Sequence, residues 1–268
     1  MIKTKEDLIE YLNKDMKRYG NTKPTLKDRL LRNDWWYFYH YLYNLRKLEY
    51  HINNNHKIKA FIRLFIHKRY CNKLRIYTYP NTLGAGIRFY HIGNFTEIKR
   101  STHIGDNCTI LSGVVIGNKG KEMDNHHVSI GNNCYIGLNV GIFGSIKIGN
   151  NVIIGANSLV NKDIPSNCVA AGNPIKIIMP LDTYYMKRKE RQTREVTELV
   201  HKYRECYGKE PDEKALHEFF WLFSDGDSQL TETWKRMMTL VGNEKESYDA
   251  LRANKKKYEN LDKFLKEI

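Results

Sequence analysis

An isoleucine or valine recurs every six residues through the middle of the chain. This interval matches neither the α-helical period of about 3.6 residues nor the β-strand period of two. A small or β-branched residue stands four positions after most of these apolar anchors. The anchors are Ile92, Ile98, Ile104, Ile110, Ile116, Ile130, Ile136, Ile142, Ile148, Ile154 and Val160, and the second column is Thr96, Thr102, Cys108, Val114, Cys134, Val140, Ile146, Val152 and Ser158.

Short repeats of this kind are typical of parallel β-helices, in which three extended segments make one triangular coil and both columns point inward. The anchors predict three to four coils. The repeat is interrupted once, because Ile116 and Ile130 lie 14 residues apart. Residues 117–129 are therefore predicted to form a loop ejected from the coils. Glycine and asparagine after the anchors permit the positive φ values that tight corners need.

Helical patterns flank this repeat, so the predicted fold class is mainly β with flanking α. Residues 1–75 are expected to form an N-terminal helical domain, residues 76–180 the β-helix, and residues 181–268 a C-terminal helical extension. Asn33 or Asp34 is a candidate N-cap for one N-terminal helix. Its apolar stripe is Trp35, Phe38, Leu42 and Leu45.

That stripe is expected to lie in a helical core or in a contact between copies of the chain. A rival interpretation places the aromatic residues on anionic lipid, as a peripheral membrane contact. In the C-terminal extension, residues 248–268 predict one terminal helix with a leucine stripe. The sequence leaves the role of this extension open.

Composition narrows the class of protein. The 268 residues carry a net charge of +14, which suggests an anionic partner, although a solvated basic surface explains the charge equally well. No nucleic-acid recognition motif accompanies the basic residues, so nucleic-acid binding is not expected. The first 20 residues are charged, unlike a signal peptide, and no apolar run approaches the roughly 20 residues that span a bilayer. The five scattered cysteines lack metal-binding spacing, and together these features predict a cytoplasmic protein with reduced thiols and no metal.

Several segments carry a resemblance to a known family. The hexads, closed by "VAAGNPIKII" (Val169–Ile178), resemble the hexapeptide-repeat acyltransferases, which fold as left-handed parallel β-helices. The opening "KTKEDLIEYLNKDMKRYG", the segment "GIRFYHIG" (Gly86–Gly93) and "HHVSIG" (residues 126–131) are similar to the serine acetyltransferase-like branch. Within that branch, they look like members of surface-polysaccharide biosynthesis. The resemblance covers residues 1 to about 180.

This resemblance implies direct transfer of acetyl from acetyl-CoA to an acceptor hydroxyl. A histidine within hydrogen-bond reach takes the hydroxyl proton as general base, and a backbone N–H at a coil corner stabilises the oxyanion. The family pattern assigns the catalytic pair to His91 and His127. The loop is expected to bring His127 towards His91 of a neighbouring subunit. A homotrimer, or a dimer of trimers, is therefore expected.

The resemblance also bears on the acceptor. Serine acetyltransferases carry aspartate and arginine where this chain has Tyr90 and His126. Neutral and aromatic side chains suit a sugar hydroxyl, in a surface polysaccharide or its precursor, better than the charged groups of an amino acid. The alternative is a serine O-acetyltransferase of cysteine biosynthesis. An alternative of another class is a non-catalytic hexapeptide-repeat scaffold.

The group that orients the catalytic imidazole stays open. The family supplies an aspartate from an Asp-x-His-Pro stretch, but the matching "YTYP" (Tyr77–Pro80) has no acid. Glu97, Asp106, Asp124 or a backbone carbonyl are the candidates.

Coenzyme A in this family lies along the groove between adjacent prisms. The positions that match the groove are Asn118, Leu138, Ala156, Lys162, Gly172 and Lys176. The two lysines are candidate partners of the phosphates. The alternative is that they are ordinary solvated surface residues.

Overall fold

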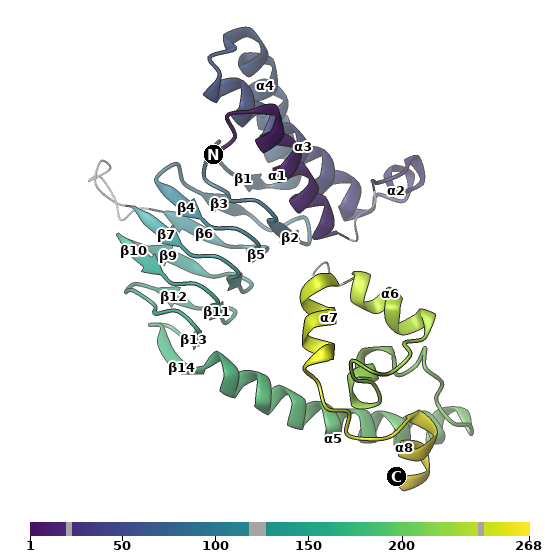
Figure 1. Cartoon of the computed structure of the whole chain (residues 1–268). Helices are drawn as coiled ribbons and strands as arrows, with labels where there is room; N and C mark the ends of the chain where they lie inside the picture. The colour runs from purple at the N-terminus through teal and green to yellow at the C-terminus, as the bar shows by residue number, and fades with distance from the viewer. Residues whose placement is uncertain (20–22, 118–126, 241–243) are drawn as a thin grey trace. The chain divides into compact units, whose positions relative to one another are not determined.

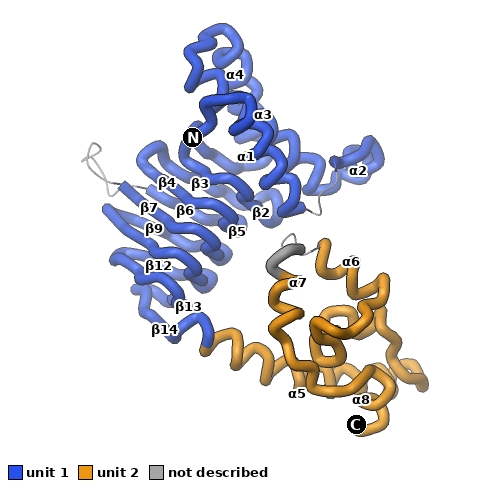
Figure 2. Tube along the Cα trace, viewed as in Figure 1, with its two compact units in different colours: residues 1–182 blue, residues 183–268 orange. Residues whose placement is uncertain are grey.

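The computed structural model describes residues 1–19, 23–117, 127–240 and 244–268, and the side chains of all of these except residues 240 and 244–246. The chain forms two compact units, residues 1–182 and 183–268 (Figure 2). Among the described helices, none is long and apolar enough to cross a bilayer. The helices of the first unit are α1 (Lys5–Lys17), α2 (Leu26–Leu30), α3 (Asp34–Asn53) and α4 (Lys57–Leu74), and α5 (Leu181–Tyr207) begins at its end.

Three sheets form the faces of a prism in the first unit (Figure 1). Every neighbouring pair of strands in them is parallel except β13 and β14. Sheet A contains β1 (Ile76–Tyr77), β3 (Thr96–Ile98), β6 (Val115–Gly117), β9 (Gly141–Phe143) and β12 (Leu159–Val160). Sheet B contains β4 (Thr102–Ile104), β7 (Val128–Ile130) and β10 (Ile146–Ile148). Sheet C contains β2 (Arg88–Tyr90), β5 (Thr109–Leu111), β8 (Tyr135–Ile136), β11 (Ile153–Ile154), β13 (Cys168–Ala171) and β14 (Lys176–Pro180).

The predicted anchors fill the interior of this prism. From Ile98 to Val160, every anchor is at most 1% exposed. The second column is buried as well, which confirms that both columns point inward. Only Ile92 is partly exposed, because it lies in an irregular corner before β3. The six-residue interval therefore identifies the inward-facing positions of a three-sided coil.

Stacked asparagines hold the corners in register. Asn133, Asn151 and Asn167 all have φ between 56° and 59°, and each side chain hydrogen-bonds to the next one in the stack. A second pair, Asn139 and Asn157, repeats the arrangement at another corner. Asparagine tolerates the left-handed region and gains a partner from the adjacent coil, which explains its choice at these positions.

The structure refines two predictions about the repeat. The interruption is narrower than residues 117–129, because Gly117 ends β6 and Val128 begins β7. The prism also starts before the first hexad, with an additional coil that contains β1 and β2. Its interior residues do not follow the six-residue interval, so the sequence pattern missed it. They are Ile76, Leu83, Ile87 and Phe89, each at most 4% exposed.

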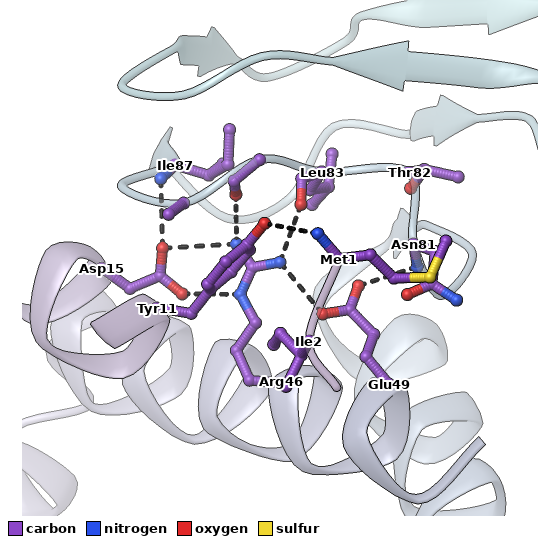
Figure 3. Close-up of polar contacts among 12 residues, drawn as sticks. Met1, Ile2, Tyr11, Asp15, Arg46, Glu49, Asn81, Thr82, Leu83 and Ile87 are labelled. Carbon is purple, nitrogen blue, oxygen red and sulfur yellow. Dashed lines mark hydrogen bonds and ion pairs between the residues drawn. The ribbon is translucent and has the colours of Figure 1, made fainter. Parts of the chain in front are cut away.

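Helices α1 and α3 pack on this first coil through a buried ionic cluster, which we call the junction cluster (Figure 3). It consists of Asp15, Arg46 and Glu49. The Arg46 guanidinium is fully buried and donates to both carboxylates and to the carbonyl oxygens of Leu83 and Gly84. Although burial lowers the pKa of Arg46, the two carboxylates raise it above its ordinary value.

The junction cluster also satisfies backbone donors of the first coil. Asp15 accepts from the N–H groups of Gly86 and Ile87, at 2.8 and 3.2 Å, and Glu49 accepts from the N–H of Asn81 at 2.8 Å. Burial raises the pKa of Glu49, and the adjacent Arg46 opposes this rise. Each carboxylate thus joins a helix to the coil beneath it.

The helix predicted around Trp35 is α3, and its N-cap is Asn33, whose side chain accepts from the N–H of Trp35. Phe38, Leu42 and Leu45 lie in the hydrophobic core. Their burial confirms the core interpretation of this stripe, and it rules out the rival in which the stripe rests on lipid.

The second unit is helical and has its own core of buried aliphatic and aromatic residues. The prediction of a single terminal helix over residues 248–268 is wrong. The helix ends at Arg252, and further along the chain the N–H groups of Lys257 and Tyr258 donate to the carbonyl oxygen of Leu222. The elements that follow α5 are a 3₁₀ helix, η1 (His217–Leu222), and three α-helices, α6 (Glu232–Leu240), α7 (Glu244–Arg252) and α8 (Leu261–Glu267).

Candidate active site

His91 stands directly after β2, at the corner where the chain passes from sheet C to sheet A. Its side chain is 78% exposed, and its φ is +58°. Among the described residues of 76–180, every other positive φ belongs to asparagine or glycine. A histidine in the left-handed region is uncommon, and such outliers cluster at functional sites. The backbone therefore places an accessible imidazole where the repeat otherwise uses asparagine or glycine.

A carboxylate from the helical region faces this imidazole. Asp34, the first residue of α3, lies with Oδ2 4.0 Å from Nδ1 of His91, and its side chain is 44% exposed. The distance exceeds that of a hydrogen bond, although such contacts often shorten when substrate binds. A carboxylate at Nδ1 favours the tautomer with the proton there, leaving Nε2 as the acceptor. Asp34 lies 57 positions before His91 in the sequence, so no local motif pointed to it.

The carboxylates that the sequence suggested for orienting the catalytic imidazole have other partners or lie outside the described residues. Asp106 accepts from the N–H of Ala85 and pairs with Lys14 in α1. Glu97 pairs with Lys99, the residue directly after its strand β3. Asp124 lies outside the described residues.

Tyr90 is the aromatic neighbour of His91, with ring centroids 6.0 Å apart. It is half-buried, and the Arg88 guanidinium stacks on its ring at 4.5 Å. The Arg88 cation packs on one face of the Tyr90 ring. This contact leaves Tyr90 beside the imidazole as a partly exposed aromatic surface.

Three of the predicted cofactor positions lie in a column on the same corner as His91. The register of β2, β5, β8, β11 and β13 places Ser112, Leu138, Ala156 and Gly172 successively along it. The N–H of Asn157 donates to the carbonyl of Leu138 at 2.8 Å, and the N–H of Leu159 donates to that of Gly172 at 3.0 Å. We call this edge of the prism the His91 corner. Ala156 and Gly172 are exposed on this edge, whereas the carbonyl oxygens of Leu138 and Gly172 already accept hydrogen bonds within the coils.

The two lysines predicted to bind the cofactor lie at different corners of the prism. Lys176 is exposed on β14, where it pairs with Ala171 next to Gly172, close to the end of the His91 corner. Lys162 is exposed after β12, at the different corner between sheets A and B. Asn118 lies outside the described residues.

His127 stands on this second corner, immediately before β7. It is exposed, and its carbonyl oxygen accepts from the N–H of Ile146 at 3.2 Å. Its predicted companion His126 lies outside the described residues. Within one copy of the chain, the two predicted catalytic histidines therefore occupy different edges of the prism.

The cysteines do not form a metal site. Cys108 and Cys134 are buried in the second column, and each thiol points at a main-chain carbonyl of the next coil, at 3.1 Å. Within the described parts of the chain, no group of three or more histidine, cysteine, aspartate or glutamate side chains is arranged to hold a metal ion.

These features define a three-sided β-helix with an exposed histidine at one edge, and comparisons with known proteins place it in a class. The family model described as the hexapeptide repeat of succinyl-transferase matches residues 92–118 and 127–162. Serine acetyltransferase 4 of Arabidopsis thaliana is 44% identical over 96 residues, which are 36% of this chain and 27% of that protein. Galactoside O-acetyltransferase of Escherichia coli is 36% identical over 126 residues, covering 41% of this chain and 62% of that protein.

A solved structure extends the likeness beyond the repeat. The serine acetyltransferase of Neisseria gonorrhoeae superposes with a TM-score of 0.55 and 26% identity, over 66% of this chain and 68% of that one. The central segment is thus a hexapeptide-repeat, left-handed parallel β-helix related to acetyltransferases, as its sequence predicted. The chain spans little more than a quarter of the Arabidopsis relative.

Proposed function

We propose that this protein is an acetyl-CoA-dependent O-acetyltransferase whose general base is His91. The observation that carries the proposal is the strained, exposed histidine on the same corner as Leu138, Ala156 and Gly172. Relatives that acetylate a hydroxyl of serine or of a galactoside support the reaction class.

The chemistry follows from the position of the imidazole. A hydroxyl is a weak nucleophile at neutral pH because its proton is tightly held. Nε2 of His91 takes that proton as the hydroxyl oxygen bonds to the thioester carbonyl carbon. The carbon–sulfur bond then breaks, and the protonated imidazole returns its proton to the departing thiolate. Asp34 stabilises the imidazolium at Nδ1 between these two steps.

The complete site needs a second copy of the chain. His91 and His127 occupy different corners of one prism, so side-by-side prisms are required to bring them together. A cyclic trimer joins unlike edges of neighbouring copies in this way and yields three equivalent sites. The same groove would hold the pantetheine chain along the His91 corner, with Lys176 and Lys162 as partners of the phosphates. A dimer of trimers remains compatible with this arrangement.

For the acceptor, L-serine is the first candidate because a serine acetyltransferase is 44% identical over its matched residues, against 36% for the galactoside O-acetyltransferase. A sugar hydroxyl of a surface polysaccharide is the second. Serine acetyltransferases have an aspartate at the position of Tyr90. The partly exposed ring of Tyr90 therefore favours the sugar acceptor. We propose a cytoplasmic location for either acceptor, because the five scattered cysteines suit a reducing compartment.

Release of the coenzyme A thiol from acetyl-CoA tests the proposal. The purified protein is incubated with L-serine, with galactosides and with nucleotide sugars, each in turn. The matched variant is His91→Asn, because asparagine accepts a positive φ and so keeps the corner while removing the base. Turnover should fall by roughly 10²-fold or more in this variant. Binding of acetyl-CoA without turnover on any acceptor would support the scaffold alternative, and an unchanged rate would remove His91 from the role.

A further inference from the structure

Helix α4 presents an apolar stripe that none of the described residues of the first unit covers. Ile58, Phe61, Ile62 and Phe65 are 79%, 73%, 53% and 58% exposed, respectively. Their spacing of three and four residues places them on one face of the helix. The opposite face packs against α3 and β1 through buried residues, including Cys71 and Leu74. The exposed stripe is therefore additional to the face that α4 needs for folding.

Cations surround the stripe, and α4 has no carboxylate. The helix contains Lys57, Lys59, Arg63, Lys68, Arg69 and Lys73, without a single aspartate or glutamate. Along the helix wheel, Lys57 and Lys68 flank one side of the stripe and Lys59 flanks the other. Arg69 lies over the Phe65 ring at 5.7 Å. Among the described residues, no ion pair joins any of these cations to an acid.

The charge discriminates between possible occupants. A second copy docked on this face about a two-fold axis would bring the same lysines against each other, with no acid on α4 to neutralise them. A duplex nucleic acid would meet the cations, but its bases are stacked inside the helix and cannot cover an apolar stripe that includes Ile58 and Ile62. An anionic bilayer surface satisfies both, because its headgroups pair with the lysines while the stripe enters the boundary with the acyl chains.

We propose that the outer face of α4 docks the protein on an anionic membrane surface. This inference goes beyond the acetyl transfer proposed above and does not depend on it. Docking through α4 would bring a hydroxyl acceptor held at the bilayer within reach of the enzyme.

Flotation of the full-length protein with vesicles tests the inference in the absence of acetyl-CoA. One set of vesicles contains phosphatidylcholine with about one-third phosphatidylglycerol, and the other contains phosphatidylcholine alone. The wild type should float with the anionic vesicles only. Phe61→Ser/Phe65→Ser and, separately, Lys57→Gln/Lys59→Gln/Lys68→Gln should each weaken this binding by roughly tenfold or more.

The matched control changes the same number of charges at exposed positions in α5 and just after it. Lys187→Gln/Lys202→Gln/Lys209→Gln should leave flotation near the wild-type level. Sedimentation velocity of each variant in solution reports the oligomeric state alongside. The inference is overturned if the wild type does not float with anionic vesicles, or if the α5 control weakens binding as much. It is also overturned if the phenylalanine variant alters the oligomer while vesicle binding persists, which would assign α4 to a second copy.

Discussion

The interior of the prism and the junction between the helices and the first coil are stabilised by different kinds of interaction. In the prism, aliphatic side chains of similar size repeat coil after coil, and each contributes a similar share of buried area. At the junction, one guanidinium and two carboxylates satisfy one another and several backbone groups, without any repeat. The stability of the prism is distributed over many equivalent positions, whereas that of the junction depends on the single guanidinium that neutralises both carboxylates.

The junction should therefore be the more sensitive of the two to a single change. Arg46→Met leaves the Asp15 and Glu49 carboxylates buried without their cation, which should lower the free energy of unfolding by about 3–5 kcal/mol. Chemical denaturation of the purified variant measures the loss. Adding Asp15→Leu and Glu49→Met should recover part of it, because no buried charge then remains. A loss below about 1 kcal/mol in the single variant would show that the cluster is not the principal joint.

Truncation of one anchor of the prism should lower the free energy of unfolding by somewhat less than the loss of Arg46. Ile148→Ala removes buried methyl groups from one coil among several, and we expect a loss of about 2–4 kcal/mol. Its exposed neighbour in β10 is the control, and Lys147→Ala should change stability by less than about 0.5 kcal/mol. Equal effects at the two positions would contradict the inward and outward alternation of that strand.

The two regions should also differ in their response to pH. His67 in α4 is buried, and its Nε2 lies 3.0 Å from the carbonyl oxygen of Thr78 in the first coil. Burial lowers the pKa of His67 below 6.5, so the folded state binds a proton less readily than the unfolded state does. Its contribution is therefore present above pH 6.5 and is lost as the pH falls through the lower, folded-state value.

We expect the smallest of these effects here: a decline in unfolding free energy between pH 7 and pH 5 that is shallower in His67→Gln. Denaturation curves across this range measure it. The Ile148→Ala variant, whose change lies in the prism, should keep the wild-type slope. An identical pH dependence in wild type and His67→Gln would exclude this histidine as the source.

The same contrast explains what could be predicted from the sequence. The hexads identified the inward columns because a short, regular period repeats over many coils. The first coil lies within the predicted β-helix of residues 76–180, but its inward positions were not identified because Leu83, Ile87 and Phe89 do not follow that period. The buried position of Arg46 was not predicted, since its partner Asp15, on another helix, becomes adjacent only after folding.

The candidate site divides along similar lines. His91 was predicted through the family resemblance, but its positive φ and the facing Asp34 emerge only from the folded backbone. The assignment of Leu138, Ala156 and Gly172 to one groove stays a prediction, and their common corner makes it physically consistent. Lys162 on another corner fits the same groove only if a neighbouring copy contributes that edge.

The central claim is a site shared between copies, and mixing two inactive variants tests it most directly. His91→Asn and His127→Asn are each expected to be strongly impaired alone. When the two are co-expressed, every mixed trimer contains one interface with both histidines intact. Random assembly should then restore thiol release from acetyl-CoA to about a quarter of the wild-type rate. Activity that stays at the level of the separate variants would contradict a site built from His91 of one copy and His127 of the next.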